Sequence, residues 1–196
     1  VYQAFNDAIA DYAVEHQTFG GPKFSTERMT WIKPNFLWMM YRCGWAQKDQ
    51  NQARVLAIRI SKQCFETLLA NAWISSFGSS AFATREEWKA AKATSGVVCQ
   101  WDPDHNPFGN KEIRRAIQLG IRPRFVASVY LPGILAIEDI TAFVKEQHQR
   151  MQQSGGTAGL IVPVERPYIV ESMEVHTALG LDSSCGEAAQ EGGPSS

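Results

Sequence analysis

Short runs of branched and aromatic apolar residues, bounded by polar or turn-forming residues, predict several strands. Residues 55–60 (VLAIRI) and 96–102 (GVVCQWD) have this composition. In residues 114–121 the large apolar residues Ile117, Leu119 and Ile121 alternate with small or polar ones, as expected for a strand. The predicted strands cover residues 1–5, 55–60, 96–102, 114–121 and 159–164, with residues 167–172 as a candidate partner of the last.

Capping and stop signals predict helices between these strands. Asn6, Ser61 and the Thr84–Glu87 capping box mark helix starts, and Gly44 marks a helix end. The predicted helices cover residues 6–16, 34–43 with Pro34 in the first turn, 62–74, 84–93, 124–131, and 138–153 starting at residue 138 or 139.

The order of the predicted elements indicates an α+β fold. Strands and helices alternate without a regular βαβ spacing, so we expect one domain over residues 1–181, with a mixed or mostly antiparallel sheet and short flanking helices. Residues 182–196 are rich in Ser, Gly, Glu and Ala and predict a disordered tail. Because the chain opens within a strand-like run, we also expect native residues upstream of Val1.

Composition narrows the classes of function. The net charge of −1 over 196 residues provides no global basic field for nucleic acid. Neither a signal peptide nor an apolar run long enough to span a membrane is present, so we expect an intracellular protein, cytoplasmic or nuclear. The scattered Cys43, Cys64 and Cys99 are expected to be buried free thiols and Cys185 an exposed one. Without a C-x-x-C pair or His spacing for a metal, we expect no metal site.

The familiar phosphate-binding and hydrolase motifs are absent. The chain has no G-x-G-x-x-G, G-x-x-x-x-G-K-[ST], H-E-x-x-H or G-x-S-x-G sequence. This argues against P-loop kinases, Rossmann dehydrogenases, zincins and α/β-hydrolases.

Residues 30–45 (TWIKPNFLWMMYRCGW) are the strongest candidate for a binding site. Trp31, Lys33, Trp38, Tyr41 and Arg42 combine aromatic surface with cations, and on a helix Arg42 lies four residues after Trp38. A planar ring could stack on tryptophan while a phosphate binds the arginine or lysine. The alternative is a core helix with one arginine reaching solvent.

Polar residues near strand ends add further candidates. Gln100 and Trp101 lie at one strand end, Arg115 and Gln118 in the next strand, and Glu165 after a later apolar run. Glu165 is a candidate catalytic carboxylate for glycosyl transfer, and Gln100 is a second catalytic candidate. Trp101, Arg115 and Gln118 are candidate cofactor contacts.

Structural interpretations of the same residues stay open. Asp102 before Pro103 is typical of a turn cap, and arginines at a strand edge discourage unwanted strand pairing. Neighbouring Glu165 and Arg166 are a common exposed pair with no special role.

The blocks VYQAF, MTWIKPNFLWMMYRCGW, QARVLAIRI, VVCQWDPD, RRAIQLGI, IEDIT and VPVERPY together resemble domain-of-unknown-function family 4291, in order and as far as Tyr168. The family pattern usually has Ser at Asn35 and Cys43 and an acid–base pair at Asp104 and His105, which argues against catalytic roles for positions 35 and 43. Family members also tend to carry an Arg-containing segment before VYQA.

A second, shorter resemblance is to the DNA-targeting ADP-ribosyltransferase toxins. It is carried by a Pro-aromatic helix entry leading to Arg42 and Cys43, followed by the strand VLAIRI. It implies a split α+β sheet that holds NAD as a substrate without a Gly-rich loop. Arg42 would meet the phosphates, Trp31, Trp38 or Tyr41 the nicotinamide, and Glu165 or another late carboxylate would activate an acceptor such as nucleic acid.

A binding module without catalysis is the alternative function. It would stack a nucleotide or a nucleic-acid single strand on tryptophans and hold phosphates with cations. The residues in question are Trp31, Trp38, Trp45 and Trp101 for stacking, and Lys33, Arg42, Arg114 and Arg115 for phosphate.

Overall fold

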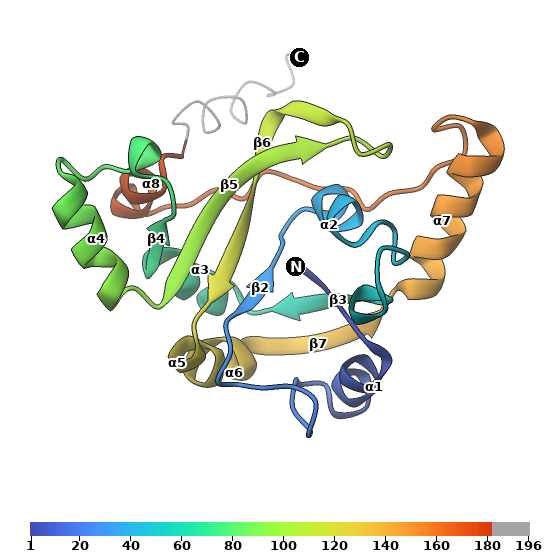
Figure 1. Cartoon of the computed structure of the whole chain (residues 1–196), viewed down its shortest axis with the longest axis horizontal. Helices are drawn as coiled ribbons and strands as arrows, with labels where there is room; N and C mark the ends of the chain where they lie inside the picture. Colours follow the sequence, from blue (N-terminus) through green and yellow to red (C-terminus); the bar gives the residue numbers. More distant parts are fainter. Residues whose placement is uncertain (182–196) are drawn as a thin grey trace, which may run out of the picture.

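The computed structural model describes residues 1–181 and contains two separate β-sheets rather than the single sheet that was expected (Figure 1). The α+β class and the mixed, mainly antiparallel pairing are confirmed. The predicted tail at residues 182–196 and Cys185 lie outside the described residues.

The first sheet has three antiparallel strands in the order β1-β3-β7. They are β1 (Tyr2–Phe5), β3 (Arg54–Ile60) and β7 (Ile134–Asp139). The first two were predicted, whereas β7 was not, because its sequence ILAIED precedes a helix without any turn signal.

The second sheet has four strands in the order β2-β6-β5-β4. They are β2 (Thr30–Ile32), β4 (Ala72–Ile74), β5 (Val97–His105) and β6 (Lys111–Ile121). β4 runs parallel to β5 and the other pairs are antiparallel. The last two strands are longer than predicted and form one hairpin, because the sequence DPDHNPFGN continues the ladder before it turns.

The two sheets meet at Tyr2 and Lys33, which form an isolated antiparallel bridge. The Tyr2 amide donates to the Lys33 carbonyl at 2.8 Å, and the Lys33 amide donates to the Tyr2 carbonyl at 3.1 Å. Lys33 therefore lies at the seam between the sheets, directly after β2.

Helices and helical turns connect and flank the strands. They are α1 (Asp7–His16), α2 (Phe36–Cys43), α3 (Lys62–Ala70), α4 (Arg85–Thr94), α5 (Pro123–Phe125), a π-helical turn (Val126–Tyr130), α6 (Leu131–Gly133), α7 (Thr141–Ser154), α8 (Met173–Leu179), and 3₁₀ turns at Gln50–Gln52 and Phe77–Ser79. No helix in residues 1–181 is long and apolar enough to cross a membrane.

The predicted N-terminal caps are confirmed at three helices. The side chains of Asn6, Ser61 and Thr84 accept hydrogen bonds from backbone amides in the first turn, and Thr84 forms a capping box with Glu87. These local signals act within a few residues, which is why the sequence alone could place them.

Three helix boundaries differ from the prediction. α7 begins at Thr141 rather than at residue 138 or 139, because these two residues still pair with β3 as part of β7. α2 begins at Phe36 rather than Pro34, because the Asn35 side chain caps it by accepting from the Trp38 amide at 2.7 Å. α3 ends at Ala70, and the next residues pair with β5 as a strand instead of extending the helix to Ile74. Tertiary pairing thus overrides a helical pattern there.

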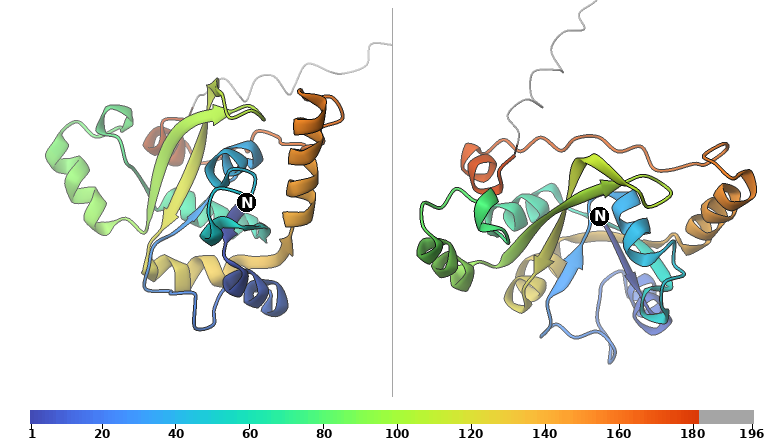
Figure 2. Two further views of the ribbon diagram at one scale, coloured as in Figure 1. Left: turned by 45° about the vertical axis from the view of Figure 1, so that its right-hand side comes forward. Right: turned by 45° about the horizontal axis from the view of Figure 1, so that its top comes forward.

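The predicted strands at residues 159–164 and 167–172 are wrong. The connection from α7 to α8 is extended but has no sheet partner, and it crosses from one side of the molecule to the other (Figure 2). Some of its apolar residues face solvent, with Val164 at 89% exposure, whereas Leu160, Val162 and Val170 pack against the buried clusters. Neither sheet pairs with these segments, so apolar composition alone did not make them strands.

Two clusters of buried side chains hold the fold together. The larger one lies around Leu56, Leu68 and Leu119, and the smaller one packs α2 against α7 through residues such as Met39, Met40 and Val144. The expectation of buried free thiols is confirmed at Cys43, Cys64 and Cys99. Burial raises the pKa of Cys64 to about 11 and that of Cys99 to about 12.

Candidate functional site

A cavity of about 410 Å³ lies at the seam between the two sheets. Its walls come from β1, β2, β6, α2 and the turn at Gln50–Gln52. The lining residues are Gln3, Ala4, Phe5, Met29, Thr30, Trp31, Lys33, Met39, Arg42, Gln52 and Gln118. Four of the residues that the sequence singled out therefore share one cavity.

Lys33 is the most unusual residue in this cavity. It is only 6% exposed, and no described residue accepts a hydrogen bond or forms an ion pair with its ammonium group, which lies 5.7 Å from the centre of the Trp38 ring. Burial, and next the positive charge of Arg42, lower the pKa of Lys33 to about 8. A mostly buried cation without an ion-pair partner is costly, so an anionic ligand would stabilise it.

Arg42 brings a second cation to the same cavity. It lies in the last turn of α2, three residues after Met39, and both side chains line the cavity as neighbours on one helix face. No carboxylate of residues 1–181 forms an ion pair with its guanidinium. The two cations together make the cavity electropositive, and arginine presents a fork that fits phosphate or carboxylate oxygens.

Trp31 forms an aromatic wall of the cavity. It pairs with Gly120 on β6, and a Cβ atom at that glycine would come within 2.8 Å of the indole ring and of the Met29 sulfur. The indole can lie across the strand only because Gly120 has no side chain. The ring is thus fixed in place beside the two cations.

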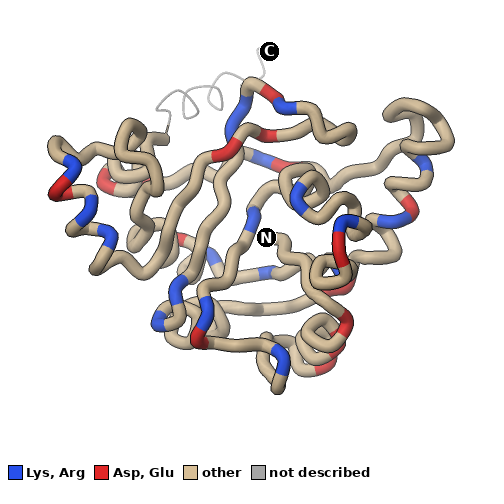
Figure 3. Tube along the Cα trace, in the orientation of Figure 1, with Lys and Arg blue, Asp and Glu red and all other residues tan. Residues whose placement is uncertain are grey.

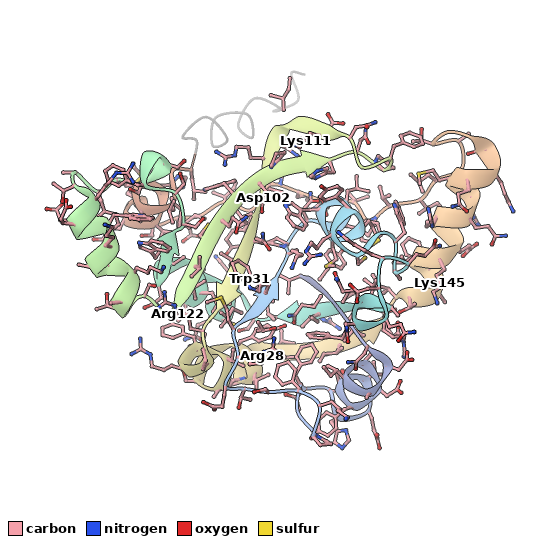
Figure 4. All side chains as sticks on the ribbon, in the orientation of Figure 1. Arg28, Trp31, Asp102, Lys111, Arg122 and Lys145 are labelled. Carbon is pink, nitrogen blue, oxygen red and sulfur yellow. The ribbon has the colours of Figure 1, made fainter. Side chains whose placement is uncertain are left out.

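Gln118 reaches the cavity from β6 as part of a hydrogen-bonded group of three side chains. Its Nε2 donates to Asp102 Oδ2 at 2.9 Å, and Gln100 Nε2 donates to Asp102 Oδ1 at 2.9 Å. Figure 4 labels Asp102 on β5 and Trp31 on β2. Gln100 belongs to this group but does not line the cavity.

Gln3 is a lining residue that sequence reasoning missed. Its Nε2 donates to Thr30 Oγ1 at 2.8 Å and to the Trp31 carbonyl at 3.0 Å, and its Oε1 accepts from the Tyr130 hydroxyl at 2.6 Å. The signal was a buried glutamine in the middle of VYQAF. With every hydrogen-bonding group engaged by the protein, Gln3 holds β1 against β2 and shapes the wall.

Trp101 and Arg115 lie on the other face of the four-stranded sheet. Gln118 pairs with Gln100, whereas Trp101 pairs with Ile117 and Arg115 pairs with Pro103. Because side chains alternate along a strand, Trp101 and Arg115 point to the face opposite Gln118. Trp101 Nε1 donates to the Leu179 carbonyl at 2.8 Å, and Arg115 Nη2 donates to the Trp101 carbonyl at 2.9 Å. Trp101 thus fastens α8 to the sheet, and Arg115 lies over the Trp101 ring, 5.8 Å from its centre.

Trp38 and Tyr41 also lie away from the cavity lining. Trp38 is 5% exposed, and its Nε1 has no hydrogen-bond partner in the described chain. Tyr41 stacks on His105 with ring centres 3.6 Å apart, at the base of the β5–β6 hairpin turn. Trp45 is buried as well and donates through Nε1 to the Pro107 carbonyl at 3.3 Å. The idea of one surface carrying all four stacking tryptophans is therefore wrong.

Glu165, the predicted catalytic carboxylate, lies at the N-terminus of α2. It accepts hydrogen bonds from the Phe36 amide and from Asn35 Nδ2, the latter at 2.7 Å, and it does not line the cavity. Burial raises the pKa of Glu165, and the nearby Asp104 adds to the rise. The position is favourable for a carboxylate because the helix N-terminus is positive.

Charges of both signs are spread over the described chain. Lys and Arg are interspersed with Asp and Glu along the trace in Figure 3, and Arg114 is paired with Asp104. Within residues 1–181, no group of three or more His, Cys, Asp or Glu side chains is arranged to hold a metal ion. The chemistry of the cavity therefore rests on its two cations, Trp31 and the Gln118 amide.

The sequence blocks quoted above lie within a family match that covers most of the chain. No curated protein matches the chain, and no solved structure matches it either, so the resemblance to ADP-ribosyltransferases stays a prediction. The chain belongs to the family described as a domain of unknown function (DUF4291), whose model matches residues 1–168.

Proposed function

We propose that the cavity at the seam binds a nucleotide, with a planar ring on Trp31 and phosphate on Lys33 and Arg42. The observation that carries this proposal is the mostly buried Lys33 side chain, whose ammonium forms no ion pair within the described chain and shares the cavity with a second cation. Phosphate oxygens would satisfy both cations, and a base or nicotinamide ring would cover the indole.

The dimensions of the cavity support this class of ligand. Its volume of about 410 Å³ falls in the range of small-molecule sites, which is roughly 300–1,000 Å³. Its aromatic lining residues are Phe5 and Trp31, which suits a single nucleotide or one end of a dinucleotide such as NAD. A long single strand would need further stacking residues on the same face, and Trp101 lies on the opposite face.

Titration calorimetry with ADP and with NAD tests the proposal. We expect the wild-type chain to bind ADP, and Arg42→Ala to weaken binding at least about tenfold through loss of a charge-assisted contact, without unfolding. Arg166→Ala is the matched control, because this exposed arginine does not line the cavity. Absence of binding at millimolar ADP and NAD would contradict the proposal.

ADP-ribosyl transfer from NAD is a second candidate, favoured by a fixed carboxylate beside the cavity. Asp102 is oriented by two glutamine amides, and its charge acts on Lys33. Carboxylates stabilise the oxocarbenium-like centre that forms in glycosyl transfer. Nicotinamide release with DNA or RNA oligonucleotides as acceptors is the measurement. Loss of release in Glu165→Gln would assign the role to Glu165, and loss in Asp102→Asn alone would assign it to Asp102.

A further inference from the structure

Lys33 has an unpaired amine that a molecule in the cavity can reach. The side chain is mostly buried, at 6% exposure, and it lines the cavity. Its Nζ is nevertheless not among the unpartnered side-chain nitrogens of the described chain that are sealed from solvent. No carboxylate of residues 1–181 forms an ion pair with it. The nitrogen is therefore open on the cavity side and free of a competing anion from these residues.

The carboxylate whose charge acts on Lys33 is engaged by other side chains. Asp102 Oδ1 accepts from Gln100 Nε2 and Oδ2 accepts from Gln118 Nε2, both at 2.9 Å. Lys33 and Gln118 come level across the β2–β6 register, and both line the cavity. The two amides thus take the place of the ammonium as hydrogen-bond partners of Asp102.

The surroundings of Lys33 favour the neutral form of its amine. Burial, and next the positive charge of Arg42, lower the pKa of Lys33 to about 8, while Cys43 and Asp102 act in the opposite direction with less effect. At pH 7.5 roughly a quarter of Lys33 is then neutral, against about 0.1% of an ordinary lysine. Desolvation and a neighbouring cation are two ways in which proteins turn a lysine into a nucleophile.

Arg42 provides an anchor for a ligand beside this amine. It lines the same cavity, and its guanidinium forms no ion pair within the described chain. The planar guanidinium fork fits phosphate oxygens. A small molecule with its phosphate on Arg42 would hold its other end near Lys33, since the two cations are close enough for their charges to interact.

We infer that Lys33 is a nucleophile that forms a Schiff base with small aldehydes or ketones whose phosphate group binds Arg42. The neutral amine adds to the carbonyl carbon, the C=O bond breaks and a C=N bond forms. The carbonyl oxygen leaves as water with the two hydrogens of the amine, so the step needs no oxidant or reductant. This inference goes beyond the proposed nucleotide site and does not rest on it.

D-Glyceraldehyde 3-phosphate and D-glyceraldehyde are matched probes that differ in the phosphate. Each is added to the wild-type chain at pH 7.5, sodium cyanoborohydride reduces the imine to a stable secondary amine, and peptide mass spectrometry measures the modified fraction of each lysine. We expect the phosphorylated probe to label Lys33 at least about tenfold more than the exposed Lys111. Without the phosphate, labelling of Lys33 should fall at least about fivefold and that of Lys111 should stay the same.

Arg42→Ala tests the anchor. The substitution removes both the phosphate-binding group and the charge beside Lys33, so labelling of Lys33 by the phosphorylated probe should fall at least about tenfold. Arg166→Ala, at an exposed position outside the cavity, is the matched control and should be labelled like the wild-type chain. Thermal unfolding checks that each variant is folded. If Arg42→Ala fails to fold, the comparison of the two probes on the wild-type chain decides the question.

The outcomes separate this inference from the proposed function. Labelling of Lys33 that does not exceed that of Lys111 overturns the inference, even where calorimetry detects ADP binding and the nucleotide site stands. Equal labelling of Lys33 by the two probes, or undiminished labelling in folded Arg42→Ala, also overturns it. Selective, phosphate-dependent labelling in a chain that binds neither ADP nor NAD supports the inference and contradicts the nucleotide site.

Discussion

The two faces of the four-stranded sheet carry similar residues in different states. On one face Trp31 shares a cavity with Lys33 and Arg42, whose cations form no ion pair with a described residue. On the other face Trp101 and Arg115 bond to backbone carbonyls, those of Leu179 and Trp101. Both faces combine tryptophan with a cation, but the cations beside Trp31 have no ion-pair partner in the described chain, whereas Arg115 bonds to a backbone carbonyl.

The comparison teaches that residue type does not identify a binding site in this fold. A tryptophan with its N–H engaged and an arginine bonded to a carbonyl already have their requirements met, so they contribute to stability. A buried lysine without an acceptor costs free energy in the folded state. Such a cost is expected to persist where function uses the charge.

The largest expected effect lies on the packed face. Trp101→Ala removes a large half-buried ring and the hydrogen bond to Leu179, so we expect it to lower the free energy of unfolding by roughly 3 kcal/mol. Urea denaturation measures the loss. ADP affinity of the folded variant should be unchanged within about twofold, because Trp101 does not line the cavity. A strong loss of ADP binding would contradict the assignment of binding to the Trp31 face and of stability to the Trp101 face.

On the cavity face, Lys33→Met should affect binding instead of stability. The substitution keeps the length of the side chain and removes its charge, so we expect ADP affinity to fall about 100-fold, the size of a strong charge-assisted interaction. The free energy of unfolding should stay constant or rise, because a buried unpaired charge is gone. Lys111→Met, on the exposed part of β6, is the matched control. Marked destabilisation by Lys33→Met would indicate a structural role.

Trp31→Ala should have a smaller effect on binding that depends on the ligand. Loss of the stacking surface is expected to weaken ADP binding about tenfold and to leave pyrophosphate binding unchanged, because pyrophosphate has no ring to stack. Calorimetry with both compounds makes the comparison. Equal weakening of the two would mean that Trp31 supports the cations rather than the base.

The smallest expected effect is a pH dependence of binding. With the pKa of Lys33 at about 8, its protonated fraction falls between pH 7 and pH 8.5, and ADP affinity should fall roughly fourfold over this interval. Lys33→Met should lack this dependence. A wild-type affinity that is constant to pH 9 would show that the ligand does not contact the ammonium.

Deprotonation of Lys33 at higher pH is expected to weaken binding but to increase the stability of the fold. Because the pKa of Lys33 is lower in the folded chain than in the unfolded chain, the unfolded chain binds more protons between pH 8 and about pH 10.4. The contribution of Lys33 to the free energy of unfolding therefore rises with pH over that interval. Comparing wild type with Lys33→Met by urea denaturation at several pH values isolates this contribution.

The sequence predicted elements well where the signal is local. The caps at Asn6, Ser61 and Thr84 and the strand at residues 55–60 depend on neighbouring residues alone. It failed at β2 and β4, which have three residues each and exist because they pair with β6 and β5. Strands this short have too few positions to show an alternating pattern.

For the candidate site, the sequence by itself determined the chemical components and the family. The unusual density of tryptophan and cations in residues 30–45 pointed to Trp31, Lys33 and Arg42 without any structure. Only the tertiary structure decided which residues share the cavity. The pleat of β5 and β6 sends Gln118 to one face and Trp101 with Arg115 to the other. The seam at Tyr2 buries Lys33 without a described acceptor, and this depends on contacts between residues far apart in the chain.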